Sequence, residues 1–529
     1  MSTTKSQSSQ GSILRSASVV GFFTLLSRLA GLLRDQVTAY YFGAGTVADA
    51  FFVAFRIPNF LRRLLAEGAL TPAFVPVFTQ KLKSEGIAGA ASLFRGAYTL
   101  LTLFLLLLTV LGIILAPQIV AVLAPGFLDD PEQLALTVTL ARILFPYILL
   151  MSLTALAMGA LNSMGHFTLP ALAPVALNFA MIMGAIVISP KLDRPIMGLA
   201  AGAVLGGVLQ LALQIPQLCK AGKFLLPSFK FKNPALWKML SLMAPAALGG
   251  AAYQISVLIN TQLVSFLPKG SVSWLYYADR LVQFPMGIFS LALATVVLPE
   301  LSRRNAAKDF DGFRDTLKSS LGLQFFITYP AMLGLIVMSQ TLVELLFQRG
   351  NFDPESSRRT ADALWAYVIG LPFMSAVTIL ARAFYSDSNT KTPATVAAVS
   401  LGLGLIAAIG LMGPLKHVGL ALSSSITAVI NFAWLALLLR GRGWLPLGPV
   451  AIESIRYLLW ALAMGLAIWP LYLTEATNTP ARLWRVGLGL ALGPAIYFGL
   501  ALVFNCPHVQ PIKSAANKLK ARLIKSKLN

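Results

Sequence analysis

The sequence is poor in charge. Only 12% of its 529 residues are charged, about half the share typical of soluble domains, and 57% are hydrophobic. The polar stretches between the apolar runs are all short. These features exclude a sizeable soluble catalytic domain and predict an all-α protein that crosses a membrane many times.

Cysteine and histidine are scarce. Cys219 and Cys506 both lie at the ends of predicted helices, so no disulfide framework is expected. His166, His417 and His508 are isolated from one another, which predicts no metal site and no catalytic histidine. We therefore expect a protein that is not an enzyme and needs no cofactor.

Acidic residues are half as frequent as basic ones, 20 against 42, which gives a net charge of +22. Such a charge could indicate nucleic-acid binding, but the lysines cluster in alternate breaks at 80–96, 219–238 and 302–318 and in the tail. By the positive-inside rule, this predicts that both termini are cytoplasmic. The basic tail at 511–529 is expected to lie on anionic membrane lipids, and no nucleic acid is expected as a partner.

The apolar stretches predict fourteen transmembrane helices. They are expected near 18–41, 47–79, 97–123, 134–162, 168–189, 196–218, 239–266, 271–301, 319–347, 361–385, 393–413, 418–439, 453–473 and 484–505. The segment before them, 1–17, is expected to be a polar cytoplasmic terminus.

The first twelve helices contain an internal repeat. "VPVFTQ" at 75–80 matches "LPELSR" at 298–303, and "ALNSMGHFTLPA" at 160–171 matches "AFYSDSNTKTPA" at 383–394. Six helices per copy is an even number, so the two copies are parallel repeats. This predicts an N-lobe at 18–222, a C-lobe at 223–445, and two extra C-terminal helices within 446–510.

The first predicted helix carries charge in mid-span. Helical spacing places six residues on one stripe, namely Ser27, Arg28, Gly31, Arg34, Asp35 and Thr38. The leucines at 25, 29, 32 and 33 lie largely elsewhere on the helix. Each charge would cost at least ~2.5 kcal/mol at the bilayer centre, so the stripe needs an explanation.

Two more helices show the same feature. The second helix carries Asp49, Arg56, Asn59, Arg62, Arg63 and Glu67, and its repeat counterpart carries Asp279 and Arg280 beside Tyr276 and Tyr277. Some of these residues could snorkel to the headgroups or form structural ion pairs such as Arg34–Asp35. Arg142, Arg382 and Arg456, alone in their helices, fit that interpretation.

As a set, however, these arginines outnumber the available carboxylates. The surplus favours a wet, cationic cavity that admits an anionic group. Phosphate fits this role, because the planar guanidinium can hold it with two hydrogen bonds.

At this point the motifs are recognisable. "SRLAGLLRD", "GAGTVADAFFVAFRIPNFLRRLLAEGAL", "SVSWLYYADRL" and "ALNSMGHFTLPALAP" resemble those of the MurJ (MviN) lipid II flippases, members of the multidrug/oligosaccharidyl-lipid/polysaccharide exporter superfamily. The resemblance spans essentially the whole chain. It implies transport of an undecaprenyl-diphosphate-linked peptidoglycan precursor from the inner to the outer leaflet of the bacterial inner membrane, by alternating access, for cell-wall synthesis.

The resemblance also implies site residues. Those that match the family's important cavity charges are Arg28, Arg34, Asp49, Arg62 and Arg280, supported by Asp35, Arg63 and Glu67. Ser27, Arg56, Asn59 and Asp279 complete the predicted lining. Helices 13 and 14 would form a groove for the lipid tail, and other cell-wall synthesis proteins are candidate partners.

Some family members bind sodium through acidic residues of the second half. Here helices 9 to 12 offer only Glu344, Asp362 and Asp387, all near helix ends, so we expect the membrane potential to drive transport instead.

Other functions remain as alternatives. A flippase for another polyprenyl-diphosphate-linked oligosaccharide would need a similar cavity. A drug or ion antiporter of the same superfamily would usually need an uncompensated intramembrane carboxylate, whereas this chain has a surplus of arginine.

Overall fold

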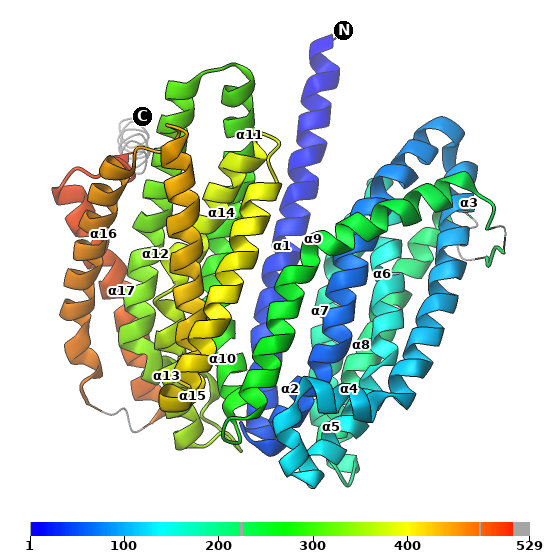
Figure 1. Ribbon diagram of the computed structural model, residues 1–529, viewed down its shortest axis with the longest axis horizontal. Coiled ribbons are helices and arrows are strands. Elements are labelled where there is room, and N and C mark those ends of the chain that lie inside the picture. The colour runs from blue at the N-terminus through cyan, green and yellow to red at the C-terminus, as the bar shows by residue number, and fades with distance from the viewer. Residues whose placement is uncertain (1, 223–225, 230, 475–477, 511–529) are drawn as a thin grey trace, which may run out of the picture. The chain divides into compact units, whose positions relative to one another are not determined.

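The computed structural model describes residues 2–222, 226–229, 231–474 and 478–510, and within these ranges the chain forms helices and no strand (Figure 1). The all-α prediction is therefore confirmed. The helices gather into two compact units. Unit 1 runs to Tyr276 and includes Arg349–Asp353, whereas unit 2 holds the other described residues from Tyr277 onward.

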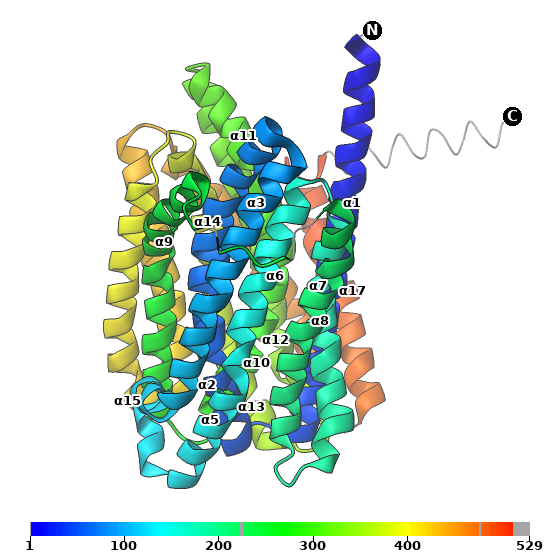
Figure 2. The ribbon, with the colours of Figure 1, turned by 90° about the vertical axis from the view of Figure 1, so that its right-hand side faces the viewer.

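Unit 1 contains α1 (Ser2–Phe42), α2 (Thr46–Leu61), η1 (Arg62–Leu70), α3 (Thr71–Ile114), α4 (Ala116–Leu123), η2 (Pro125–Asp129), α5 (Pro131–Leu144), α6 (Pro146–Ser163), α7 (Thr168–Met183), η3 (Gly184–Ile188), η4 (Ser189–Lys191), α8 (Ile196–Ala221) and α9 (Pro234–Ser265). It also contains the first turns of α10 (Ser271–Pro285). Helix α7 packs against both α1 and α8, and α6 packs against α3 and α8 (Figure 2).

Unit 2 contains the rest of α10, then η5 (Met286–Ser290), α11 (Leu291–Ala306), α12 (Phe310–Phe347), α13 (Pro354–Val368), α14 (Leu371–Tyr385), α15 (Lys391–Gly441), α16 (Leu447–Ile468), η6 (Trp469–Tyr472) and α17 (Thr479–Val503). Helix α12 is its central element, since it packs against α11, α13, α14, α16 and α17. Large aromatic side chains, including Phe325, Phe326 and Tyr457, fill the core around it.

The helix lengths agree with a multi-pass membrane protein. Ten stretches of the described residues are long and apolar enough to cross a membrane. Two of them, Thr46–Ile114 and Lys391–Gly441, span 69 and 51 residues, more than twice the ~20 that one crossing needs. Each is interrupted by a residue with positive φ, Gly86 or Lys416, so each accommodates two crossings.

Two further helices, α1 and α9, contain 41 and 32 residues; α1 covers the predicted span 18–41, and α9 covers all but the last residue of 239–266. The arrangement is thus consistent with fourteen crossings. Helix α1 begins at Ser2, so the segment expected to be a polar terminus continues the first helix.

The compact units do not coincide with the predicted lobes. The repeat assigns α9 to the C-lobe, yet α9 packs against α3 and η1 of unit 1. The short segment Arg349–Asp353 joins unit 1 because its backbone is bonded there: the amide of Asn351 donates to the carbonyl of Tyr40 at 2.9 Å. The neighbouring Gly350, with φ +59, allows this close approach.

Candidate functional site

The polar stripe of α1 is largely turned toward the protein interior, whereas several leucines of the same helix are exposed. Arg34, Asp35 and Thr38 are 8%, 2% and 3% exposed, while the leucines at 25, 29 and 33 are 47–52% exposed. Ser27, Arg28, Gly31 and Leu32 are half-buried. The helix therefore has the two-sided character that its sequence predicts.

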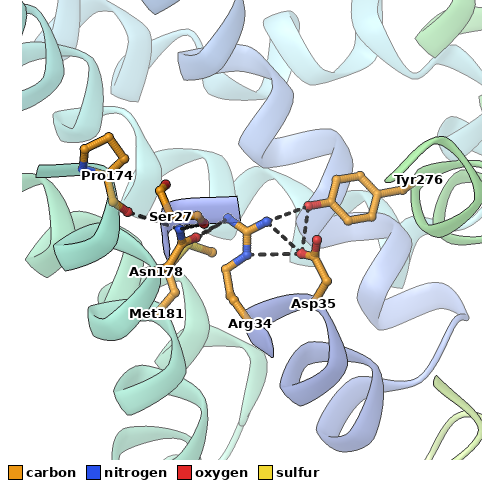
Figure 3. A network of polar contacts seen from close by, with 7 residues as sticks. All are labelled: Ser27, Arg34, Asp35, Pro174, Asn178, Met181 and Tyr276. Atoms are coloured by element: carbon orange, nitrogen blue, oxygen red, sulfur yellow. Dashed lines mark hydrogen bonds and ion pairs between the residues drawn. The ribbon is translucent and has the colours of Figure 1, made fainter. Parts of the chain in front are cut away.

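Arg34 lies at the centre of a buried network (Figure 3). Its Nε and Nη2 atoms donate to Oδ1 of Asp35, at 3.1 and 2.7 Å. Its Nη1 donates to Oδ1 of Asn178 on α7, and its Nη2 also donates to the hydroxyl of Tyr276 on α10, both at 3.1 Å. The Tyr276 hydroxyl in turn donates to Asp35 at 3.1 Å. Arg34 and Asp35 thus form the structural ion pair that the sequence left open as an alternative.

Sequence reasoning missed Asn178 and did not include Tyr276 among the site residues. Apart from Thr168 at the start of α7, Asn178 is the polar side chain of an otherwise apolar helix, so it belongs to no stripe. Tyr276 is fixed by its ring, which stacks on Phe52 of α2 with centroids 3.9 Å apart. Both residues join helices that are far apart in the sequence, and helical spacing cannot reveal such contacts.

Asp49 caps a helix. Its Oδ2 accepts a hydrogen bond from the amide of Gly270 at 2.6 Å, and its Oδ1 accepts from the amide and hydroxyl of Ser273 at 2.8 and 2.5 Å. These donors form the first turn of α10, whose partial positive charge favours a carboxylate. Asp49 is 2% exposed, so this buried carboxylate is satisfied entirely within the protein.

The loop before α10 is held from a second side. Lys269 forms an ion pair with Asp130 at 2.6 Å, and this hydrogen bond lowers the pKa of the Asp130 carboxyl. The amide of Gly126 donates to the hydroxyl of Ser265 at 3.0 Å. Two elements of unit 1 therefore hold the start of α10.

The arginines of the second predicted span lie around an irregular segment. Arg56 donates to Thr261 of α9 at 2.9 Å, and Nε of Arg62 donates to Asn59 at 3.2 Å. Residues Arg62–Leu70 form a π-helix, in which the amide of Thr71 reaches back to the carbonyl of Ala66. Such wide turns occur often at functional sites.

The remaining candidates differ in their surroundings. Arg63 is exposed, and the side chain of Glu67 lies outside the described part of the structure. Arg28 is half-buried and has no hydrogen bond or ion pair with any residue that the structure describes. Asp279, which accepts a hydrogen bond from Gln283, and Arg280 are half-buried in the part of α10 that belongs to unit 2.

Arg142, Arg382 and Arg456, which are alone in their predicted helices, each contact a nearby group. Nε of Arg142 donates to the carbonyl of Ile113 at 3.3 Å, a group left without its helical donor because residue 117 is proline. Arg456 lies over the rings of Tyr457 and Trp460, each at 5.3 Å, and Arg382 over Tyr385 at 5.7 Å. These contacts indicate structural roles.

Two of the three carboxylates considered for sodium are paired with arginine. Glu344 forms an ion pair with Arg482 at 3.1 Å, and Asp387 with Arg442 at 3.3 Å. Among the described residues, no group of three or more histidine, cysteine, aspartate or glutamate side chains could hold a metal ion.

Comparisons with known proteins agree on one family. The family model "Lipid II flippase MurJ" matches residues 38–488. The chain is 37% identical over 517 residues to the "Probable lipid II flippase MurJ" of Vibrio cholerae, covering 95% of this chain and 98% of the relative. It is 37% identical over 503 residues to the "Lipid II flippase MurJ" of Burkholderia cenocepacia, covering 93% and 98%.

The fold gives the same result. A solved structure of "Lipid II flippase MurJ, inward closed conformation" matches with a TM-score of 0.78 and 28% identity, over 93% of this chain and 99% of that one. An inward-facing multidrug resistance MATE family transporter of the MOP superfamily matches with a TM-score of 0.64 and 15% identity, over 78% and 95%, which is a likeness of fold alone. With most of its length matched by the family model and by relatives of this similarity, the chain belongs to the lipid II flippase MurJ family.

Proposed function

We propose that this chain moves lipid II, the undecaprenyl-diphosphate-linked peptidoglycan precursor, from the inner to the outer leaflet of the bacterial inner membrane. The family supports a transporter rather than an enzyme, with lipid II as its substrate. A MATE-like fold supports alternating access as the mechanism. The cycle would expose the site first to the cytoplasmic and then to the outer side.

The assignment of the site rests on one observation, that Arg28 has no partner among the described residues. This residue lies in an apolar helix, half-buried, and is not neutralised by any described residue. Asp35 is bonded to Arg34, and Asp49 to the start of α10, so neither of these two buried carboxylates is paired with Arg28. An anionic substrate would supply the missing charge.

The other substrate-binding residues have distinct roles in this proposal. Arg62 and Arg280 contribute further positive charge for the diphosphate, and Arg34 contributes as part of its network with Asp35. Asp49 acts by holding the first turn of α10 in place. The exposed leucines of α16 and α17, such as Leu466 and Leu490, would line the groove for the lipid tail.

The test is the appearance of labelled lipid II on the outer leaflet after rapid depletion of this protein from cells. We expect delivery to stop before total lipid II falls, because synthesis on the inner side continues. Undiminished delivery under full depletion would contradict the proposed function. If lipid II delivery continued while another polyprenyl-diphosphate-linked oligosaccharide stayed inside, the substrate assignment would be wrong.

A drug or cation antiporter is the weaker alternative. Such a protein would need an intramembrane carboxylate available to a cation or proton. Here Asp35 and Asp49 are both buried and hydrogen-bonded within the protein.

We expect transport to depend on the membrane potential rather than on sodium. The proposed site is cationic, and moving one charge through the membrane field is worth roughly 2.3 kcal/mol per 100 mV. An empty site would be drawn toward the negative cytoplasmic side, which would reset the transporter. In vesicles, collapse of the potential at constant sodium should therefore slow lipid II delivery.

Removal of sodium at constant potential serves as the matched comparison, and it should change the rate of lipid II delivery little. Glu344 and Asp387 favour this outcome, because each is already paired with an arginine. If sodium removal alone stops delivery, the proposed driving force is wrong.

A further inference from the structure

Asn178 of α7 is a buried amide, 7% exposed, with three hydrogen bonds. Its Oδ1 accepts from Nη1 of Arg34 at 3.1 Å. Its Nδ2 donates to the carbonyl of Ser27 on α1 at 3.2 Å and to the carbonyl of Pro174 on its own helix at 3.1 Å (Figure 3). Both hydrogens of the amide nitrogen are thus used, and its oxygen faces the guanidinium.

These partners permit only one orientation of the amide. If the amide were reversed, its NH₂ group would point at the positively charged guanidinium and its oxygen at two carbonyl oxygens. All three contacts would then be repulsive. The backbone of α1 and α7 therefore fixes the side of Asn178 that meets Arg34.

Gly31 of α1 lies beside this amide. A β-carbon at position 31 would lie 3.8 Å from Nδ2 and 3.9 Å from Oδ1 of Asn178, which is ordinary contact. A side chain larger than a methyl group would push the amide away from Arg34.

The neutral charge of Asn178 matters as much as its shape. One edge of the Arg34 guanidinium meets the carboxylate of Asp35, and the Nη1 side meets the neutral oxygen of Asn178. Asp35 therefore offsets the charge of Arg34, and Asn178 adds no charge of its own. An aspartate at position 178 would add a negative charge, in low-dielectric surroundings where repulsion of an anion is strong.

We propose that Asn178 is a positioning residue that holds Arg34 for the diphosphate of the substrate without adding negative charge. This inference rests on the proposed function, since it assigns a role toward the same anionic ligand. Asn178 itself does not touch the substrate. It acts through Arg34, whose orientation it fixes from a second helix.

The experiment measures the affinity of the purified, full-length protein for fluorescent lipid II in lipid nanodiscs. Asn178→Leu keeps the approximate size but removes the acceptor, and we expect the affinity to fall roughly tenfold, the worth of one hydrogen bond to a charged group. Asn178→Asp keeps the shape and adds charge, and we expect a loss at least about threefold larger than that of N178L.

Gln214→Leu is the matched control. Gln214 is a buried amide of α8 that donates to the carbonyl of Leu169 at 3.3 Å, so it also ties α7 to a neighbouring helix, but this bond does not involve Arg34. We expect Q214L to bind lipid II as the unmodified protein does. Thermal unfolding of each variant shows whether a loss of affinity reflects a loss of fold.

A double-mutant cycle separates positioning from packing. In an Arg34→Lys background the multiply bonded guanidinium is already gone, so N178L should cause little further loss. If Asn178 merely packs α1 on α7, N178L will lower the affinity by the same factor in both backgrounds, which would overturn the proposal. Unchanged affinity in both N178L and N178D would overturn it as well.

Should N178L fail to insert into the membrane, Gly31→Leu tests the same point by displacing the amide from the other side. We expect it to lower affinity as N178L would, and normal affinity would contradict the proposal. Failure of the unmodified protein to bind lipid II would instead contradict the proposed function.

Discussion

Replacement of Arg28 by alanine or glutamate is expected to abolish lipid II delivery and leave the protein folded and inserted in the membrane. Arg28 has no partner among the described residues, so its removal leaves no known buried group unsatisfied. The loss of one charge-assisted hydrogen bond to phosphate is worth about 1.5–3 kcal/mol, or roughly 10- to 150-fold in binding. Glutamate adds repulsion and should have the larger effect.

The measurement is growth of cells that depend on the variant once the native copy is depleted, together with the amount of variant in the membrane. Arg28→Lys is the control, because lysine keeps the charge but not the planar fork, and it should retain partial function. If R28E inserts normally and supports growth, Arg28 does not face the substrate and the proposed site is wrong.

Replacement of Arg34 by alanine should, by contrast, damage the fold. Arg34 and Asp35 form a buried ion pair, with side chains 9% and 3% exposed. Removing one partner of such a pair leaves an uncompensated buried charge and typically costs 3–5 kcal/mol. We therefore expect the R34A variant to accumulate poorly and to unfold at a clearly lower temperature than the R28A variant.

A second substitution should separate the two roles of Arg34. In Arg34→Met combined with Asp35→Leu, no charge is left unpaired, so most of the thermal stability should return while transport stays low. If R34A is as stable as the unmodified protein, the ion pair is not structural. If the double variant transports normally, the network has no role in the function.

Much of the fold could be predicted from the sequence, because a membrane imposes strong constraints. A helix satisfies its backbone groups within one segment, so in hydrocarbon each apolar run longer than about 20 residues predicts one. The division into units was less predictable. The repeat shows which segments of the sequence match one another, whereas the packing of α9 on α3 depends on side chains from distant segments.

The candidate site was predicted in part, for a similar physical reason. Helical spacing identifies the stripe around Arg34 because its members lie on one helix. It cannot identify Asn178 or the hydroxyl of Tyr276, which reach Arg34 from other helices. For Asp49, the sequence shows a buried charge but not the partner that satisfies it, the start of α10 more than 200 residues later.

The most direct test of the account uses the purified protein in liposomes that contain labelled lipid II and hold a membrane potential. With the unmodified protein, lipid II that starts on one leaflet should become accessible to a membrane-impermeant reagent on the other, faster than in empty liposomes. With the R28A variant at equal protein content, the rate should fall to that of empty liposomes. Equal rates with the unmodified and R28A proteins would contradict the central claim, that Arg28 on α1, which no described residue neutralises, receives the diphosphate of lipid II.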